Sequence, residues 1–179
     1  MIYLVTRNRQ LFKSEYYEII SLEKSIEIIK SWDLIQFDTE TSGRDPHVCK
    51  ILCAQFGNRK AGIQIVVDTS TIDICNYRNL LETKLIVGHN LKFDIQFLYN
   101  HEIIPENCWD TMIIEQLLHL GFNNKFFHYS LKDVAERRLK IDIDKTTRGE
   151  IIWRGLDDKV VLYAASLWCS VGFWCGKSH

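Results

Sequence analysis

Two acidic residues in one stretch are the first feature of the sequence that could carry chemistry. Asp38 and Glu40 follow an apolar run in the segment LIQFDTETSGRDP. Positions two apart in an extended chain point to the same side, so the two carboxylates could hold one cation between them. Acids directly after an apolar run need water or a metal ion as a partner. The alternative interpretation is a strand that runs out into a polar turn.

A third acid, Asp94, lies in the segment VGHNLKFDIQFL. The pattern predicts a strand that ends at Gly88 and a helix that begins near Asn90. Asn90 and Asp94 are four positions apart, a spacing that places both on one face of a helix. Packed on the central strand, this helix would aim Asp94 at the first two acids. The alternative is an exposed Asp on an amphipathic helix.

Other candidate residues come later in the chain. Tyr163 lies in a predicted helix from Asp157 to about Leu167 and could orient or deprotonate a metal-bound water, although a core aromatic would give the same pattern. Lys145 and Arg148 lie in a predicted loop, IDKTTRG, where they could contact phosphates or simply be solvated. Because hard cations such as Mg²⁺ prefer oxygen ligands, three converging carboxylates suit a two-metal phosphoryl-transfer site.

Composition narrows the class of protein. The chain has 179 residues, 46% of them hydrophobic, and a formal net charge of −1, which suits a single globular domain over 1–179. This charge gives no electrostatic argument for a nucleic-acid partner, so such a partner would need a local basic patch or metal ions. No signal pattern or apolar run long enough for a membrane span occurs, so a cytoplasmic location is expected. The six cysteines form no C-x-x-C pair; we expect them to be reduced and expect no structural zinc.

The elements that position these residues follow from periodicity. IYLV and YYEII predict strands, and Ser21 is the expected N-cap of a helix. KILCAQFG and AGIQIVVD predict a hairpin beside the acidic strand, which gives three strands there, and LIVG is a further short strand. A helix from about Asp73 to Glu82 precedes LIVG, and the rest is mostly helical, with Ser130 as a cap. Alternating strands and helices predict an α/β fold.

The order of these motifs resembles a known family. FDTETSGRDP, VGHNLKFDIQFL, SLKDVAERRLKIDIDK and VVLYAA are similar to the tyrosine branch of the DEDD 3′–5′ exonucleases. The similarity runs from about Leu34 to Ser166. It is greatest to the proofreading domain of family A (DNA polymerase I-like) DNA polymerases, with ribonuclease D as a more distant relative. The resemblance implies a ribonuclease H-like mixed sheet flanked by helices and removal of nucleotides from the 3′ end of single-stranded DNA.

The resemblance also implies roles for individual residues. Asp38, Glu40 and Asp94 match metal-binding acids that hold two divalent cations, Mg²⁺ or Mn²⁺, and Tyr163 matches the tyrosine that acts on the attacking water. Two more residues, Thr41 and Asn90, match positions that help to hold the terminal nucleotide. In the segment CWDTMIIEQLL, which resembles the family's intervening helix, Asp110 is expected to be structural.

One position departs from the family pattern. The fourth metal-binding aspartate, four residues after the tyrosine, is Leu167 in this chain, and no acid follows Asp158. Residues 167–179 form a tail with no resemblance, and no polymerase domain is expected in this chain. Two hypotheses therefore stay open, an exonuclease impaired by a lost ligand, and a catalytically silent nucleic-acid-binding or protein-interaction module derived from a truncated polymerase.

Overall fold

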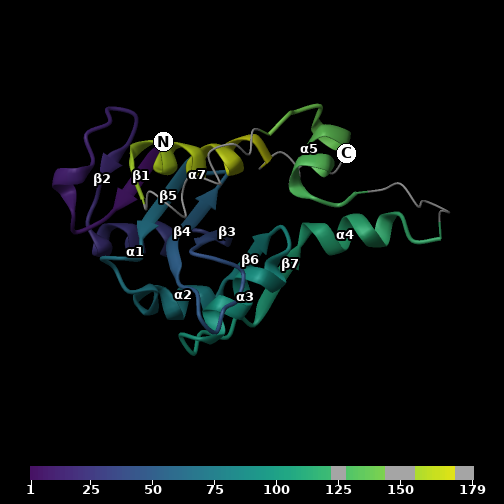
Figure 1. Ribbon diagram of the computed structural model, residues 1–179, viewed down its shortest axis with the longest axis horizontal. Coiled ribbons are helices and arrows are strands. Elements are labelled where there is room, and N and C mark those ends of the chain that lie inside the picture. The colour runs from purple at the N-terminus through teal and green to yellow at the C-terminus, as the bar shows by residue number, and fades with distance from the viewer. Residues whose placement is uncertain (122–127, 144–155, 172–179) are drawn as a thin grey trace.

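The computed structural model describes residues 1–121, 128–143 and 156–171, and for residues 166–171 it describes the backbone alone. Within these ranges the chain forms one seven-stranded mixed sheet in the order β2-β1-β5-β4-β3-β6-β7 (Figure 1). The strands are β1 Ile2–Val5, β2 Glu18–Ile19, β3 Leu34–Thr41, β4 Ile51–Asn58, β5 Ile63–Asp68, β6 Leu85–Gly88 and β7 Asn107–Asp110. The α-helices are α1 Leu22–Lys30, α2 Arg78–Thr83, α3 Leu91–Tyr99, α4 Thr111–Leu118, α5 Leu131–Leu139 and α7 Asp158–Val171. Two 3-10 helices, η1 Arg9–Leu11 and η2 Ile74–Tyr77, complete the described elements.

The pairing of the strands confirms the hairpin and extends the sheet. β3 and β5 both pair antiparallel with β4, whereas β1, β6 and β7 join through parallel ladders. The three expected strands, β3, β4 and β5, lie next to one another, and β1, β2, β6 and β7 extend the sheet on both sides.

The helix expected within CWDTMIIEQLL is present and begins at Thr111, with Asp110 as its N-cap. The residues before it form β7, a strand that was not expected, in which Trp109 lies opposite Val87 and Asp110 opposite Gly88. This strand extends the sheet beyond β6.

The two faces of the sheet are covered by different helices. In Figure 1, α1, α2 and α3 lie on one side of the sheet and α7 on the other. The first side holds the larger core, in which the Phe56 ring lies 5.4 Å from that of Phe37 and 4.7 Å from that of Tyr77, measured between centroids. On the second side, α7 packs on β1, β4 and β5 through a smaller cluster that includes Val161, Ala164, Leu4, Cys53 and Val66.

Local sequence explains where the helices begin. The Ser21 hydroxyl accepts a hydrogen bond from the Lys24 main-chain N–H at 3.2 Å, and the Ser130 hydroxyl accepts one from the Asp133 N–H at 3.3 Å. Both serines satisfy a main-chain donor that the first helical turn leaves open. The two predicted N-caps are confirmed.

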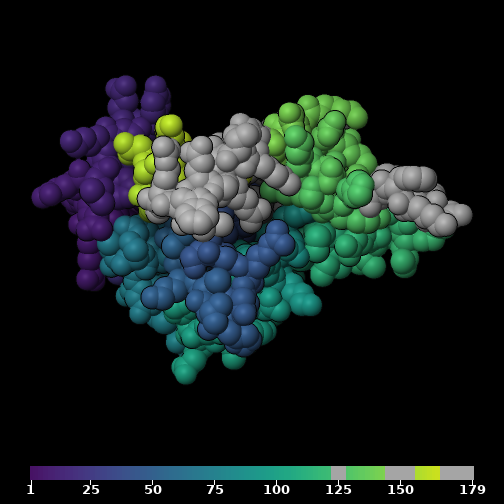
Figure 2. All heavy atoms as spheres, in the orientation of Figure 1, coloured from purple at the N-terminus to yellow at the C-terminus, as the bar shows by residue number. Residues whose placement is uncertain are grey.

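Helices α4 and α5 lie side by side at one end of the molecule, as Figures 1 and 2 show. Their contact is electrostatic, because the fully buried Glu115 of α4 accepts a hydrogen bond at 2.7 Å from Arg138 of α5 and lies 3.3 Å from Arg137. Among the described residues, no helix has both the length and the apolar character that crossing a membrane requires.

Candidate active site

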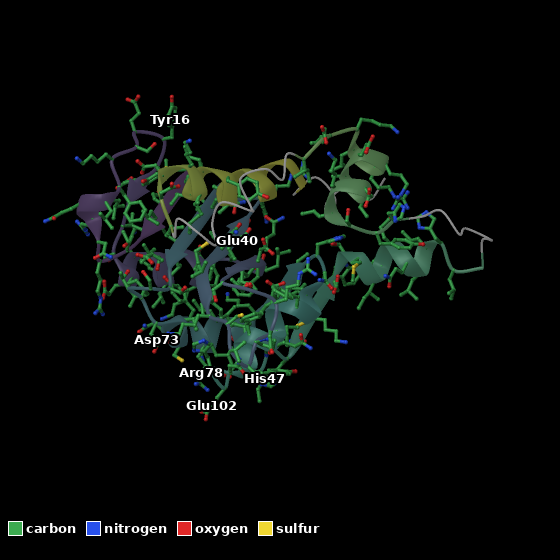
Figure 3. All side chains as sticks on the ribbon, in the orientation of Figure 1. Tyr16, Glu40, His47, Asp73, Arg78 and Glu102 are labelled. Carbon is green, nitrogen blue, oxygen red and sulfur yellow. The ribbon has the colours of Figure 1, made fainter. Side chains whose placement is uncertain are left out.

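Asp38 and Glu40 lie inside β3, and the strand ladder shows that they share one face of the sheet. Asp38 lies opposite Gln55 of β4, and Glu40 lies opposite Cys53. Glu40 is 4% exposed, and Asp38 is partly exposed. Figure 3 shows Glu40 near the centre of the molecule. The prediction that the two acids point to the same side agrees with this register, and the shared face is the one that α7 partly covers.

Cys53 lies opposite Glu40 on β4 and forms the floor of the site, and the pKa of its thiol shows that the two acids are close to it. Burial raises its pKa well above the ordinary value, and the negative charges of Glu40 and Asp38 raise it further. The thiol therefore stays protonated beneath the two carboxylates. This residue could not be found from the sequence, because the connection between β3 and β4, residues 42–50, does not fix which residue faces Glu40.

Asp94 reaches β3 from α3 at the residue between the other two acids. Its Oδ1 accepts hydrogen bonds from the Thr39 main-chain N–H at 2.9 Å and from the Thr39 hydroxyl at 2.6 Å. The β3–β6 ladder covers Leu34–Gln36, so the following part of β3 presents its edge to α3 instead. Asp94, 2% exposed, therefore takes the place of a neighbouring strand and lies within one residue of both Asp38 and Glu40 along β3.

The approach of α3 to β3 depends on Gly88. A Cβ atom at this position would lie 2.9 Å from the carbonyl oxygen of Phe37 and 2.3 Å from Cδ2 of Leu91. The absence of a side chain allows the turn from β6 into α3 to pass directly over β3. The glycine at the end of the apolar run LIVG is the sequence signal for this close approach.

Asn90 does not share a helical face with Asp94, so that prediction was wrong. Asn90 precedes the helix with φ = 63°, in the left-handed region that asparagine tolerates better than most residues, and its side chain is exposed. Its main-chain N–H donates to Oδ1 of Asp110 at 2.9 Å, and the same oxygen accepts the Met112 N–H at 2.9 Å. Asp110 thus joins the starts of α3 and α4, which confirms its structural role.

Tyr163 lies on α7 and is partly exposed. Its side chain packs against a small cluster formed by Ala135 of α5 and Ile143, while the next residue, Ala164, packs in the cluster that contains Cys53. Tyr163 therefore stands where α7 meets α5, beside the helix face that contacts the floor of the site. The α7 backbone continues to Val171, so residues 163 and 167 lie one helical turn apart.

The remaining candidates are less fully described. Thr41 ends β3, and its hydroxyl donates to the Gly43 carbonyl oxygen at 2.7 Å. Lys145 and Arg148 lie outside the described residues. Another buried acid, Asp68, faces Cys53 across the sheet but accepts hydrogen bonds from the hydroxyls of Thr6 and Ser70 at 2.6 and 2.5 Å, so it is structural.

The donor set at β3 fits hard divalent cations. Asp38, Glu40 and Asp94 offer carboxylate oxygens, the ligands that Mg²⁺ and Mn²⁺ prefer, from two elements that meet at Thr39. Asp38, Glu40 and Asp94 therefore remain the predicted ligands of metal ions at this site.

Comparison with known proteins gives a consistent result. The sequence profile of a family described as 3′–5′ exonuclease, of the DNA polymerase A type, matches residues 16–166. DNA polymerase I of Aquifex aeolicus (strain VF5) is 34% identical over 126 residues, 70% of this chain and 20% of that protein. The chain thus spans about a fifth of the length of this curated relative.

Solved structures share the fold at low identity. The structure of Escherichia coli RNase D, an exoribonuclease involved in structured RNA processing, superposes with a TM-score of 0.65 at 16% identity, over 95% of this chain and 45% of that chain. Brucella melitensis NrnC with bound Mg²⁺ superposes with a TM-score of 0.63 at 18% identity, over 96% of this chain and 79% of that chain. The expected ribonuclease H-like α/β fold is confirmed.

Proposed function

Because this chain belongs to the family of 3′–5′ exonuclease domains of the DNA polymerase A type, we propose that it removes nucleotides from the 3′ end of single-stranded DNA. Members of the family are metal-dependent nucleases. The observation that carries the proposal is the contact of Asp94 with Thr39, which brings the third acid to the strand residue between Asp38 and Glu40. We propose DNA rather than RNA as the substrate, because the relative that is 34% identical to this chain is a DNA polymerase, whereas RNase D is 16% identical.

The residues of the site have separate tasks in this proposal. Two divalent cations, Mg²⁺ or Mn²⁺, held by Asp38, Glu40 and Asp94, would supply an activated water and stabilise the departing 3′ oxygen. Tyr163 would hold a proton of the attacking water at its phenol oxygen and so orient its lone pair.

Four further residues would hold the substrate. Thr41, the last residue of β3, and Asn90, the residue before α3, would contact the terminal nucleotide. Lys145 and Arg148 would contact phosphates, so their replacement by alanine should weaken DNA binding and flatten its dependence on salt.

A second candidate function is a silent module that binds nucleic acid without cutting it. The residue that favours it is Leu167, one helical turn after Tyr163 on α7, where the family resemblance implies a fourth acid. An apolar residue there would remove one ligand charge from the metal site.

A cleavage assay separates the two functions. The full chain is incubated with 5′-labelled single-stranded DNA and Mg²⁺ or Mn²⁺, with a chelator as the blank. Stepwise shortening from the 3′ end that disappears in Asp38→Ala and persists in Asp33→Ala, an exposed acid just before β3, would support the exonuclease. Binding without shortening would support the silent module. Shortening that persists in Asp38→Ala would overturn both the proposed site and its chemistry.

A further inference from the structure

A second group of metal-ligating side chains lies at the surface, away from the acids of β3. The ligand atoms of Asp73, Cys75 and His101 all lie within 4.8 Å of one another. Asp73 is exposed, and the other two residues are half-buried. In Figure 3, Asp73 lies at the lower edge of the molecule, whereas Glu40 lies near its centre. We propose that these three residues bind one Zn²⁺ ion, with water as the fourth ligand.

The chemistry of the donors selects the metal. Asp73 offers a carboxylate oxygen, Cys75 a sulfur and His101 an imidazole nitrogen, and Zn²⁺ binds all three types in tetrahedral geometry. Sulfur and imidazole ligands are poor partners for Mg²⁺, which prefers oxygen. Donors of one zinc ion lie about 3.5 Å apart, given zinc-to-ligand distances of about 2.0–2.3 Å. Rotation of the side chains closes the small remaining gap.

Hydrogen bonds hold the three donors close together. Asp73 is the N-cap of η2, and its Oδ1 accepts the Cys75 main-chain N–H at 2.9 Å, which turns the carboxylate back over Cys75. His101 lies in the turn after α3, and Arg78 fixes this turn by donating to the carbonyl oxygens of His101 at 2.8 Å and Glu102 at 2.5 Å. The side chain of Arg78 therefore joins the residues that follow η2 to the His101 turn.

The ligand atoms are available for a metal. Among the described residues, the ring nitrogens of His101 accept or donate no hydrogen bond, and the Cys75 thiol donates to the His101 carbonyl oxygen at a long 3.7 Å. Burial raises the pKa of the Cys75 thiol, and the neighbouring Asp73 carboxylate raises it further. Zinc would therefore displace a proton from this thiol when it binds, so its affinity should fall as the pH falls.

The local charges are balanced around such an ion. The thiolate of Cys75 and the carboxylate of Asp73 together carry two negative charges, which match the two positive charges of Zn²⁺. The nearby cation, Arg78, lies 4.0 Å from the carboxylate of Glu82, and its charge also acts on Asp73 and Cys75. A bound zinc ion would connect η2 to the turn after α3 and stabilise this end of the molecule independently of the acids of β3.

The test uses the full, reduced chain in excess Mg²⁺, which keeps the oxygen ligands of β3 occupied. Zn²⁺ affinity is measured by competition with a chromophoric chelator for the wild type, Cys75→Ser and His101→Ala. We expect one tight site in the wild type and at least a tenfold loss of affinity in each variant, about 1.4 kcal/mol. Cys108→Ser and His47→Ala, at an exposed cysteine and an exposed histidine elsewhere, are the matched controls and should bind as the wild type does.

A second measurement separates lost ligands from lost folding. Co²⁺ replaces Zn²⁺, and its thiolate charge-transfer absorption in the near ultraviolet should appear in the wild type and both controls but vanish in Cys75→Ser. Melting without metal should be equal in all five proteins, and zinc should raise the melting temperature only where the site is intact. Absence of a tight site in the wild type, or equal zinc affinity in Cys75→Ser and the wild type, would overturn the proposal.

Discussion

The aspartates of this chain have different roles, and their hydrogen-bond partners show which of them serve the fold. Asp68 is surrounded by hydroxyl donors, and Asp110 accepts two main-chain N–H groups, so both serve the fold. Asp94 has two roles in this account, because its Oδ1 joins α3 to Thr39 and the residue is also a predicted metal ligand. Substitutions can therefore separate the effect of Asp94 on stability from its effect on cleavage.

The pair Asp94→Asn and Thr39→Val tests this separation. Asparagine keeps an oxygen that can accept both hydrogen bonds from Thr39, so unfolding should change little while the metal-dependent cleavage rate falls at least tenfold. Valine removes one donor from a buried carboxylate, which should lower the free energy of unfolding by about 1.5–3 kcal/mol. Urea unfolding and the 3′-end cleavage assay measure the two effects. A large stability loss in Asp94→Asn would show that the negative charge itself holds α3 in place.

At the scale of elements, α7 is the helix that carries both Tyr163 and Leu167. Its start is fixed by the N-terminal segment, because the phenol of Tyr17 and the main-chain N–H of Lys13 both donate to Oδ1 of Asp158. The same helix then packs on the floor of the site through Val161 and Ala164. Because it continues beyond residue 167, a side chain at that position follows Tyr163 by one turn.

Leu167→Asp is therefore expected to restore activity. The new carboxylate would add a ligand charge on the turn after Tyr163, so cleavage of single-stranded DNA in Mg²⁺ should rise at least tenfold, about 1.4 kcal/mol of barrier. Adding Asp38→Ala should remove the gain, whereas adding Asp33→Ala, at an exposed acid just before β3, should leave it unchanged. An unchanged rate in Leu167→Asp would mean that residue 167 does not face the acids.

The contact between α4 and α5 tests how burial changes the contribution of an ion pair to stability. Glu115 is fully buried beneath Arg137 and Arg138, whereas Lys132 and Asp142 form a pair at the surface, 2.8 Å apart. Arg138→Ala should cost about 1.5–3 kcal/mol, because a buried carboxylate loses a charged donor. Lys132→Ala should cost about 0–1 kcal/mol, because solvent screens the exposed pair. Both values come from urea unfolding, and equal losses would contradict the role assigned to Glu115.

At the scale of the whole molecule, a tyrosine in the core beneath α1 and α2 makes the free energy of unfolding depend on pH in the alkaline range. Burial raises the pKa of the Tyr77 phenol to about 12, although the 2.6 Å hydrogen bond with Ser25 lowers it in part. The unfolded chain loses this proton near pH 10 and the folded chain near pH 12, so the protonated phenol stabilises the fold below about pH 10. This contribution disappears between those two values.

Tyr77→Phe isolates that contribution. Between about pH 10 and 12 the wild type should lose about 2.7 kcal/mol more than the variant, since each pKa unit corresponds to about 1.4 kcal/mol. Ser25 still donates to the Leu22 carbonyl oxygen in the variant, so no buried hydroxyl is stranded. Tyr16→Phe, at an exposed tyrosine, is the control and should follow the wild type in denaturant titrations at each pH. Parallel curves for the wild type and Tyr77→Phe would contradict the expected loss.

The sequence by itself determined most of the elements and the order of the acids along the chain. Local patterns suffice for these, because a serine cap, an alternating strand or a helical repeat depends on neighbours within a few residues. Ser21, Ser130, the β4–β5 hairpin and the shared face of Asp38 and Glu40 all follow from such patterns. The ordered motifs also identified the exonuclease family correctly.

Only the tertiary structure decided which distant residues meet. Cys53 faces Glu40 through a register that no local pattern fixes, and Asp94 reaches Thr39 because β6 stops short of it. The strand β7 pairs with the edge of β6, a pairing that no local sequence pattern indicated. Asp73 and His101 also come together only in the folded chain, because η2 packs beside the end of α3 and no sequence spacing relates the two positions.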